Sequence, residues 1–210
     1  MDTDFDKVAR PYDFISRLVF GDALVIAQVS LLSQILPDSR ILIVGGGTGW
    51  ILEEITKIHS SGLEIIYVES SLKMIELSKR RICENNDVTF INLPVEKYQS
   101  ETQFDMIITP FFFDLFKKDK IQTLFSGISE KLKINGLWLY TDFIPDKYQT
   151  KIWQKLLLKM MYLFFGVLSK VEASELVDMD FYYTEQYNKI YEGWFYGKFV
   201  RSISYKKILK

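Results

Sequence analysis

The sequence is poor in the residues that most often build metal sites, disulfides and acid–base centres. Its 210 residues include one cysteine, Cys83, and one histidine, His59. A single cysteine forms no internal disulfide, and no metal-ligand spacing surrounds this one, so we expect no metal site and a reducing, cytoplasmic location. His59 falls at the far end of a predicted helix, about 15 Å along its axis from a glycine-rich turn. We therefore interpret it as a surface histidine near a helix C-terminus.

Neither charge nor hydrophobicity is concentrated along the chain. The 26 basic and 27 acidic side chains give a formal net charge of −1, so no strong field attracts nucleic acid or an anionic membrane. Met1 is followed by Asp2, Asp4 and Asp6, which is the opposite of a basic signal-peptide start. No uncharged apolar run reaches the length of about 18 residues that a transmembrane helix needs. We expect a soluble protein without a nucleic-acid partner.

Internal repeats, low-complexity stretches and Gly/Ser linkers are also absent, so we expect one domain, residues 1–210. Short apolar runs alternate with helical patterns, which predicts a parallel sheet covered by helices on both faces. The predicted strands are 41–44, 63–68, 88–91, 104–109 and 137–143, and the predicted helical stretches between and before them are 11–36, 50–58, 71–84 and 117–132. The fold class is α/β: a Rossmann-like, doubly wound, mostly parallel seven-stranded sheet with an antiparallel C-terminal edge hairpin.

The C-terminal third has a different pattern. A long helix is predicted over 145–169 and a short one near 172–177. On the long helix, lysines recur every four residues beside apolar positions, and such an amphipathic helix caps a pocket, forms a homodimer face or lies on a membrane surface. We favour the first two. The final strands, 182–191 and 195–205, are expected to form a hairpin around Glu192-Gly193.

A glycine-rich turn follows the first predicted strand. The segment Gly45-Gly46-Gly47-Thr48-Gly49 lies where open parallel sheets bind ligands. Close approach of a ligand to the backbone would explain why glycine stands at these positions, and the next helix presents free N–H groups. A dinucleotide fingerprint would need glycine where Trp50 stands, and a phosphate-binding P-loop would need a lysine after Gly49. The spacing excludes both phosphate-binding motifs.

The spacing Gly45-x-Gly47-x-Gly49 resembles motif I of the class I S-adenosylmethionine-dependent methyltransferases. Glu69 ends the second predicted strand, where this family has an acidic residue that accepts hydrogen bonds from both ribose hydroxyls of the cofactor. Residues 93–96, 104–107 and 132–137 resemble the family's adenine-binding segment, its fourth strand and the loop before its fifth. The resemblance implies S-adenosyl-L-methionine as cofactor and methyl transfer as activity. The cofactor-binding residues it implies are Tyr12, Gly45, Gly46, Gly47, Gly49, Glu69, Ser70, Val95, Glu96 and Thr109.

Within the family, residues 5–14 resemble the entry helix of the ubiquinone and menaquinone C-methyltransferase group, where Tyr12 would reach the methionine end of the cofactor. The sequence departs from the family pattern at Ile43 and Pro94, which stand where acidic residues near the cofactor's amino group and adenine are usual. A non-catalytic nucleotide- or metabolite-binding protein of the same fold is therefore an alternative.

The resemblance also divides the domain into three expected parts. Residues 1–36 form an N-terminal helical cap, residues 37–143 the cofactor-binding core, and residues 144–210 a helical lid or dimer segment followed by the hairpin.

Methyl transfer needs mainly the in-line placement of donor and acceptor about 3 to 3.5 Å apart, and a base only for weak nucleophiles. Asp114 and Asp142 lie at the ends of strands four and five, where the acceptor pocket should open. Each is a candidate general base or acceptor-orienting group. We favour structural roles instead, a helix cap for Asp114 and a loop hydrogen bond for Asp142.

Thr109-Pro110-Phe111-Phe112 occupies the position of the Asn/Asp-Pro-Pro-Tyr/Phe motif of base-modifying N-methyltransferases. Threonine lacks the required amide or carboxylate, so a nucleic-acid base is a disfavoured acceptor. The run 111–113 of phenylalanines suggests an apolar acceptor pocket, although core packing would also explain it. The leading prediction is methyl transfer to a small, apolar or aromatic acceptor. A protein-modifying methyltransferase that docks its target on the C-terminal hairpin is another alternative.

Overall fold

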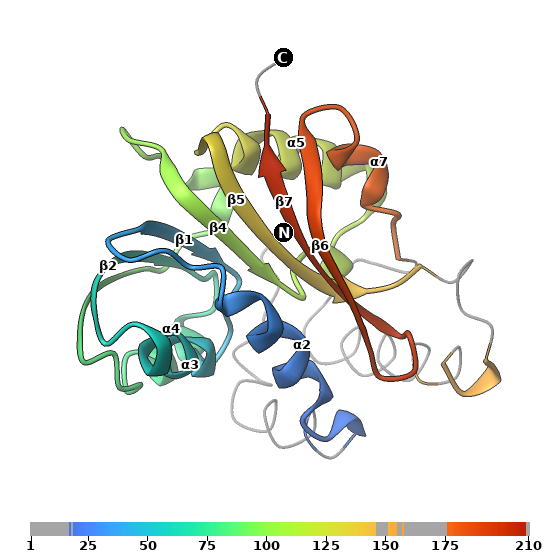
Figure 1. The fold of residues 1–210 in the computed structure, drawn as a ribbon, viewed down its shortest axis with the longest axis horizontal. Helices are drawn as coiled ribbons and strands as arrows, with labels where there is room; N and C mark the ends of the chain where they lie inside the picture. Colours follow the sequence, from blue (N-terminus) through green and yellow to red (C-terminus); the bar gives the residue numbers. More distant parts are fainter. Residues whose placement is uncertain (1–16, 18, 146–150, 155–156, 158–175, 209–210) are drawn as a thin grey trace.

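A seven-stranded sheet of order β3-β2-β1-β4-β5-β7-β6 forms the centre of the molecule (Figure 1). The computed structural model describes residues 17, 19–145, 151–154, 157 and 176–208. The strands are β1 (Arg40–Val44), β2 (Ser61–Val68), β3 (Asn85–Ile91), β4 (Phe104–Pro110), β5 (Leu132–Phe143), β6 (Tyr187–Phe195) and β7 (Val200–Lys207). The first five are parallel, and β7 is antiparallel to both β5 and β6. The predicted sheet and its antiparallel C-terminal edge are confirmed.

Helices cover both faces of the sheet. The α-helices are α2 (Ala23–Leu32), α3 (Trp50–Ile58), α4 (Leu72–Ser78), α5 (Lys118–Ser129) and α7 (Asp180–Tyr183), and the 3-10 turns are η2 (Val95–Lys97) and η3 (Phe113–Leu115). Residues of α2, α3 and α4 share one buried cluster with the sheet. Those of α5, α7, η2 and η3 share another on the opposite face. Two cores with the sheet between them are the doubly wound arrangement.

The apolar run in β1 shows why its strand is central. Ile41 and Ile43 belong to the cluster beneath α3, whereas Leu42 and Val44 belong to the cluster beneath α5. Successive side chains of a strand point to opposite faces, so a strand covered on both sides needs apolar residues throughout. Ile43, which stands where the family usually has an acid, is therefore a fully buried core residue.

Aromatic side chains build much of the core beneath α5 and α7. The Phe125 ring stacks on Trp138 with centroids 5.1 Å apart, and Tyr183 stacks on Tyr205 at 3.8 Å. Tyr183 also meets Phe125 edge-on at 4.8 Å. Offset and edge-on contacts of this kind add to the stabilisation from burial, so many of the aromatic residues of the sequence are packing residues.

The predicted hairpin turn at Glu192-Gly193 is wrong. Both residues lie inside β6, where they pair with Ile203 and Ser202, and the turn follows at 196–198. Its residues Tyr196, Gly197 and Lys198 have φ of 48, 62 and 69°, the left-handed conformation that tight turns require. Gly193 does not form a turn; its lack of a side chain instead accommodates the neighbouring Phe195 ring inside the strand.

Several other boundaries differ from expectation. The helix predicted over 71–84 ends at Ser78, and Tyr182, predicted as the start of a strand, lies in α7. The predicted turn Asn135-Gly136 lies inside β5, where Asn135 has φ of 64° and the pairing with β4 shifts register. An isolated glycine in a strand often marks such an irregularity.

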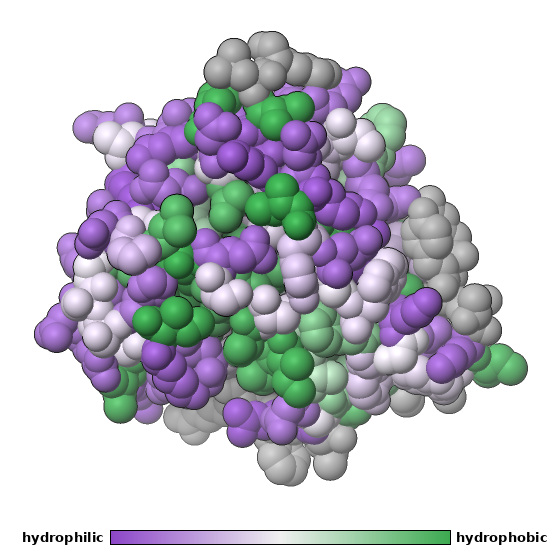
Figure 2. Space-filling view, viewed as in Figure 1, coloured by the Kyte–Doolittle hydropathy of each residue, from purple (hydrophilic) through white to green (hydrophobic). Residues whose placement is uncertain are grey.

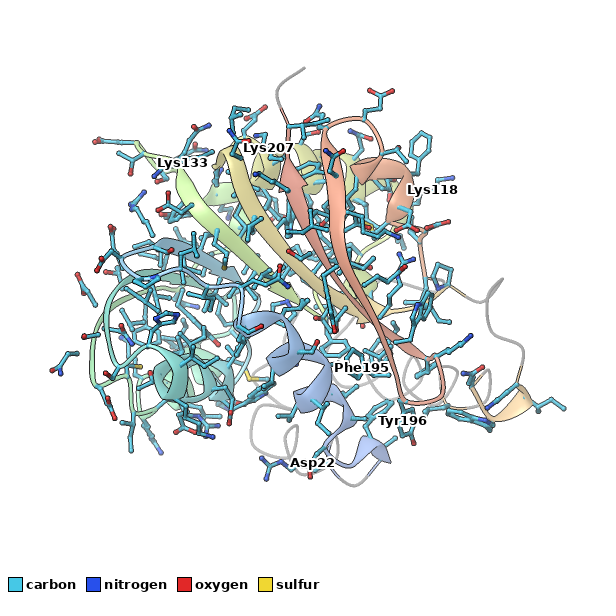
Figure 3. All side chains as sticks on the ribbon, in the orientation of Figure 1. Asp22, Lys118, Lys133, Phe195, Tyr196 and Lys207 are labelled. Carbon is cyan, nitrogen blue, oxygen red and sulfur yellow. The ribbon has the colours of Figure 1, made fainter. Side chains whose placement is uncertain are left out.

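The C-terminal hairpin reaches back to the N-terminal part of the chain. Phe195 and Tyr196 lie at its turn end near Asp22, which precedes α2, whereas Lys133 and Lys207 lie at the other end of the sheet (Figure 3). The Tyr196 hydroxyl donates to the Val19 carbonyl at 2.8 Å. Hydrophobic side chains gather over α2 on this face of the molecule (Figure 2).

Most of the predicted helix 145–169 lies outside the described residues, as does the short helix near 172–177, so their roles stay predictions. The three-part division of the domain stays a prediction too. Within residues 151–154, Trp153 meets the Tyr196 ring edge-on at 5.4 Å, and the Gln154 amide donates to the Gly197 carbonyl at 2.9 Å. No helix in the described part of the chain is long and apolar enough to span a membrane.

Candidate cofactor and acceptor site

The glycine-rich turn lies between β1 and α3, at the carboxyl edge of the sheet. Gly45, Gly47 and Gly49 have φ of 67, 62 and 78°, a region that other residues rarely adopt. The Gly45 amide donates to the Val68 carbonyl at 2.9 Å, which joins the start of the turn to the end of β2. The sequence folds into a turn here because glycine supplies these left-handed positions.

Three of the four glycines are needed for packing inside the protein. A Cβ at Gly45 would lie 2.8 Å from the Phe112 ring, one at Gly46 would lie 2.6 Å from the Tyr67 ring, and one at Gly49 would lie 2.7 Å from Ser78 Cα. Real Cβ atoms do not approach other atoms so closely. Packing within the protein therefore requires glycine at these three positions, and the close approach of a ligand stays a prediction.

Gly47 differs from the other three. A Cβ built there meets no atom of the described residues within 4 Å, and its amide donates to Glu69 Oε2 at 3.2 Å. The backbone at Gly47 therefore borders open space beside a carboxylate. Among these glycines, this is the position at which a ligand can reach the main chain.

Glu69 lies directly after β2 and is 7% exposed. Besides the Gly47 amide, its carboxylate accepts the Ser71 amide at 2.9 Å and the Ser70 hydroxyl at 3.4 Å. Burial raises the pKa of Glu69, and these hydrogen bonds act in the opposite direction. Each carboxylate oxygen can accept about two hydrogen bonds, so Oε2, which accepts the Gly47 amide, retains capacity for a hydroxyl donor of a ligand.

Side chains that the sequence reasoning missed hold this turn in place. The Asn92 amide donates to the carbonyls of Glu69 and Ser70 at 3.0 and 2.9 Å. Tyr67 donates to the Gly47 carbonyl at 3.0 Å, and Arg81 donates to the Thr48 carbonyl at 3.0 Å. The alternation of β2 carries a usable signal for Tyr67, because it shares a face with Glu69 two residues later. Nothing in the local sequence indicates Asn92 or Arg81.

Comparison with known proteins agrees with this geometry. Residues 41–136 match a family model described as a methyltransferase domain. A malonyl-[acyl-carrier protein] O-methyltransferase of Halalkalibacterium halodurans is 29% identical over 153 residues, 69% of this chain and 55% of the relative. A ubiquinone/menaquinone biosynthesis C-methyltransferase of Geotalea daltonii is 29% identical over 113 residues, 51% of this chain and 48% of the relative.

The matched family model, the methyltransferase relatives and the fold together support a class I S-adenosylmethionine-dependent methyltransferase. The magnesium protoporphyrin IX methyltransferase of Synechocystis, solved with bound S-adenosylhomocysteine, has the same fold, with a TM-score of 0.65 at 14% identity over 88% of this chain and 81% of that one. The chain spans about half the length of the curated relatives it matches.

The cofactor of this family is S-adenosylmethionine, and the residues present fit it. The buried carboxylate of Glu69, with hydrogen-bonding capacity to spare, stands at the end of β2 and faces Gly47, the glycine of this turn that borders open space. That Glu69 accepts hydrogen bonds from the ribose hydroxyls, as the resemblance implies, stays a prediction. Glu69, Ser70 and the glycines 45–49 are brought together, as the sequence predicts.

The other predicted cofactor residues are placed less directly. Val95 is buried in η2, and Glu96 beside it is exposed. Thr109 is fully buried, and its hydroxyl accepts the Trp138 indole N–H at 2.9 Å. Tyr12 lies outside the described residues, and all four assignments stay predictions.

His59 lies at the opposite end of α3 from the glycine-rich turn. It is the C-terminal cap of α3, and its Nε2 lies 3.0 Å from the Ile35 carbonyl oxygen. Within the described residues, no group of three or more His, Cys, Asp or Glu is arranged to hold a metal ion.

The three consecutive phenylalanines point to different places. Phe111 has φ of 50° and packs on Phe143 with centroids 4.9 Å apart. Phe112 lies under Gly45, and Phe113 joins the core 6.2 Å from Trp138. Core packing accounts for Phe113, and the close approach to the turn accounts for Phe112. Phe111 is partly exposed, and its left-handed backbone is unusual for a bulky residue.

Asp114 and Asp142 are brought together at the carboxyl edge. Asp142, at the end of β5, accepts the amides of Phe113 and Phe143 at 3.2 and 2.8 Å. Burial raises the pKa of Asp142 to about 7, and burial and the Asp142 charge raise that of Asp114 well above its usual range. Asp142 makes the expected loop hydrogen bonds. Asp114 is not the cap of α5, because Lys117 occupies that position.

Proposed function

We propose that this chain transfers a methyl group from S-adenosylmethionine to a small, apolar or aromatic acceptor. The observation that carries the proposal is the pairing of Gly47 with Glu69, a main-chain position bordering open space beside a buried carboxylate. When bound, the cofactor supplies an activated sulfonium methyl group. The task left to the protein is to hold donor and acceptor in line.

A mostly buried aromatic cluster lies at the same edge of the sheet, and its partly exposed members Phe111 and Tyr196 support an apolar acceptor. Phe143, at the end of β5, has the rings of Phe111, Phe199 and Phe20 around it at 4.9, 5.2 and 5.7 Å. Tyr196 adds its ring to Phe20 at 5.3 Å. Aromatic and aliphatic surfaces favour planar, weakly polar ligands. Within this cluster, Phe111 comes directly after the end of β4.

A second candidate is methylation of a group carried on a protein. Three matched relatives are named for a malonyl-[acyl-carrier protein] substrate, and β6, an edge strand among the described residues, exposes Ile190 and Trp194. A free strand edge with apolar side chains favours a macromolecular contact. Loss of product formation on a carrier-linked substrate after charge substitution at Trp194, with small acceptors still methylated, would favour this candidate.

The direct test is transfer of a labelled methyl group. Wild-type protein with labelled S-adenosylmethionine and a panel of quinol, phenol, carboxylate and amine acceptors is expected to give labelled product. A protein that binds S-adenosylhomocysteine but labels neither the panel nor a carrier-linked acceptor would indicate the non-catalytic alternative. A cytoplasmic location, a homodimer, contact with a membrane surface and the absence of a nucleic-acid partner stay predictions.

A further inference from the structure

A cluster of charged and phenolic side chains lies beneath the carboxyl end of β5, on the face that η3 and α7 cover. Asp142 of β5 stands opposite Arg201 of β7 in the antiparallel register, and residues so paired project to the same face. The other titratable members are Tyr140 of β5, Asp114 of η3, Tyr205 of β7, Asp180 and Tyr183 of α7, and Glu192 of β6.

The two carboxyl groups of the cluster are unequally supported. Asp142 accepts hydrogen bonds from two backbone amides and faces the Arg201 guanidinium. Asp114 has little support, and its Oδ1 is buried without a hydrogen-bond partner in the described part of the chain. Two neighbouring buried carboxyls do not both ionise readily, so one proton remains on the pair. Of the two, Asp142 is the better supported site for a negative charge and Asp114 the better site for the proton.

Arg201 is fixed rather than free to move. Its Nη2 and Nη1 bind the two oxygens of Asp180 at 2.5 and 2.9 Å, and Nη1 lies 3.4 Å from Glu192. The guanidinium also lies over the Trp194 ring at 5.5 Å. A bidentate pair has a defined geometry, so Arg201 presents its charge to Asp142 from one place.

A second observation separates this cluster from a purely structural network. The Tyr183 hydroxyl, on a side chain that is 1% exposed, has no hydrogen-bond partner among the described residues, as is true of Asp114 Oδ1. Leaving a buried polar atom unpaired costs about 1–3 kcal/mol. Two such atoms on one cluster indicate a place where another polar group is received.

We propose that Arg201, anchored by Asp180, is a positioning residue that keeps the negative charge on Asp142, so that the Asp114–Asp142 pair accepts the proton released during methyl transfer. This inference rests on the proposed function. A bond forms between the acceptor atom and the methyl carbon while the methyl–sulfur bond breaks and its electron pair stays on sulfur. The proton of the acceptor's O–H, N–H or S–H group goes to the carboxylate pair. The acceptor class is accordingly one that loses a proton on methylation.

Titration of the carboxyl groups tests the positioning role without any activity assay. The full chain, labelled with carbon-13 at the aspartate carboxyls, is followed by NMR against pH, with Asp114→Asn and Asp142→Asn used for assignment. Arg201→Gln is expected to raise the Asp142 midpoint by about one pH unit, and Arg201→Lys to retain most of the wild-type value. Arg40→Gln is the matched control, because Arg40 pairs with Glu64 at 2.8 Å at the other end of the sheet.

An unchanged Asp142 midpoint in Arg201→Gln overturns the inference, whether or not the protein transfers methyl groups. Should Arg201→Gln not fold, Asp180→Asn replaces it, and an Asp142 midpoint unmoved when the anchor is removed has the same meaning. For wild type and Arg201→Lys, the acidic limb of the kcat profile is expected to follow the NMR midpoint. A limb that stays in place refutes the proton-accepting role, whereas binding of S-adenosylhomocysteine by the same samples tests the donor site separately.

Discussion

The substitutions Gly49→Ala and Gly47→Ala each add one methyl group to the same turn. We expect the first to reduce stability more and the second to reduce cofactor binding more. Both positions have positive φ, 78 and 62°, so each substitution costs about 1–2 kcal/mol of backbone strain. At Gly49 the new Cβ would also lie 2.7 Å from Ser78 Cα, a main-chain atom of α4, and such overpacking costs about 1–3 kcal/mol more. The free energy of unfolding is thus expected to fall by about 2–5 kcal/mol in Gly49→Ala and by about 1–2 kcal/mol in Gly47→Ala.

Binding should follow the reverse order. Gly47 borders open space beside Glu69, so a methyl group there occupies the volume a cofactor would need. Urea unfolding followed by circular dichroism gives the two stabilities, and calorimetry with S-adenosylhomocysteine gives the affinities. Either of two results would refute this prediction: Gly47→Ala destabilised as much as Gly49→Ala, or Gly47→Ala binding S-adenosylhomocysteine with wild-type affinity.

The remaining predictions concern pH and core packing. Burial raises the pKa of both Asp114 and Asp142, so the folded chain binds more protons than the unfolded chain between about pH 4 and 7, and stability from this pair falls as pH rises through that range. Asp114→Asn should reduce this loss of stability. Urea unfolding at pH 5 and pH 8 measures it, and an unchanged difference in the free energy of unfolding between the two pH values would contradict the raised pKa values. Phe125→Ala should cost about 3–5 kcal/mol, because its ring is buried against Trp138. Phe181→Ala, at a side chain 76% exposed, should stay within about 0.5 kcal/mol in the same assay.

The sequence was sufficient for the parallel core because its signals are local and repeated. Residues 41–44 are apolar on both faces and are followed by glycines, and Glu69 comes at the end of the next strand, so both the sheet and the donor side of the site could be predicted. The signals at Gly193 and Asn135-Gly136 were misleading. Glycine marks any position where a Cβ does not fit, whether in a turn, beside a bulge or under a neighbouring ring.

Long-range partners account for what could not be predicted. Arg201 meets Asp142 only because β7 inserts between β5 and β6, and Asn92 reaches the carbonyls of Glu69 and Ser70 from the loop after β3. The raised pKa values of Asp114 and Asp142 likewise depend on burial that the chain acquires only on folding. Candidate residues at strand ends could be named from the sequence, but their partners and charge states could not.

The central claim is that Glu69 binds the ribose of the cofactor. Calorimetry of S-adenosylhomocysteine with wild type, Glu69→Gln and Glu64→Gln tests it, since Glu64 is an exposed glutamate of β2, the strand that Glu69 follows. Binding by wild type and Glu64→Gln, with affinity at least about tenfold weaker in Glu69→Gln, is the predicted result, because the amide loses charge-assisted acceptance of hydroxyl hydrogens. No binding by wild type, or equal affinity in Glu69→Gln, would contradict it.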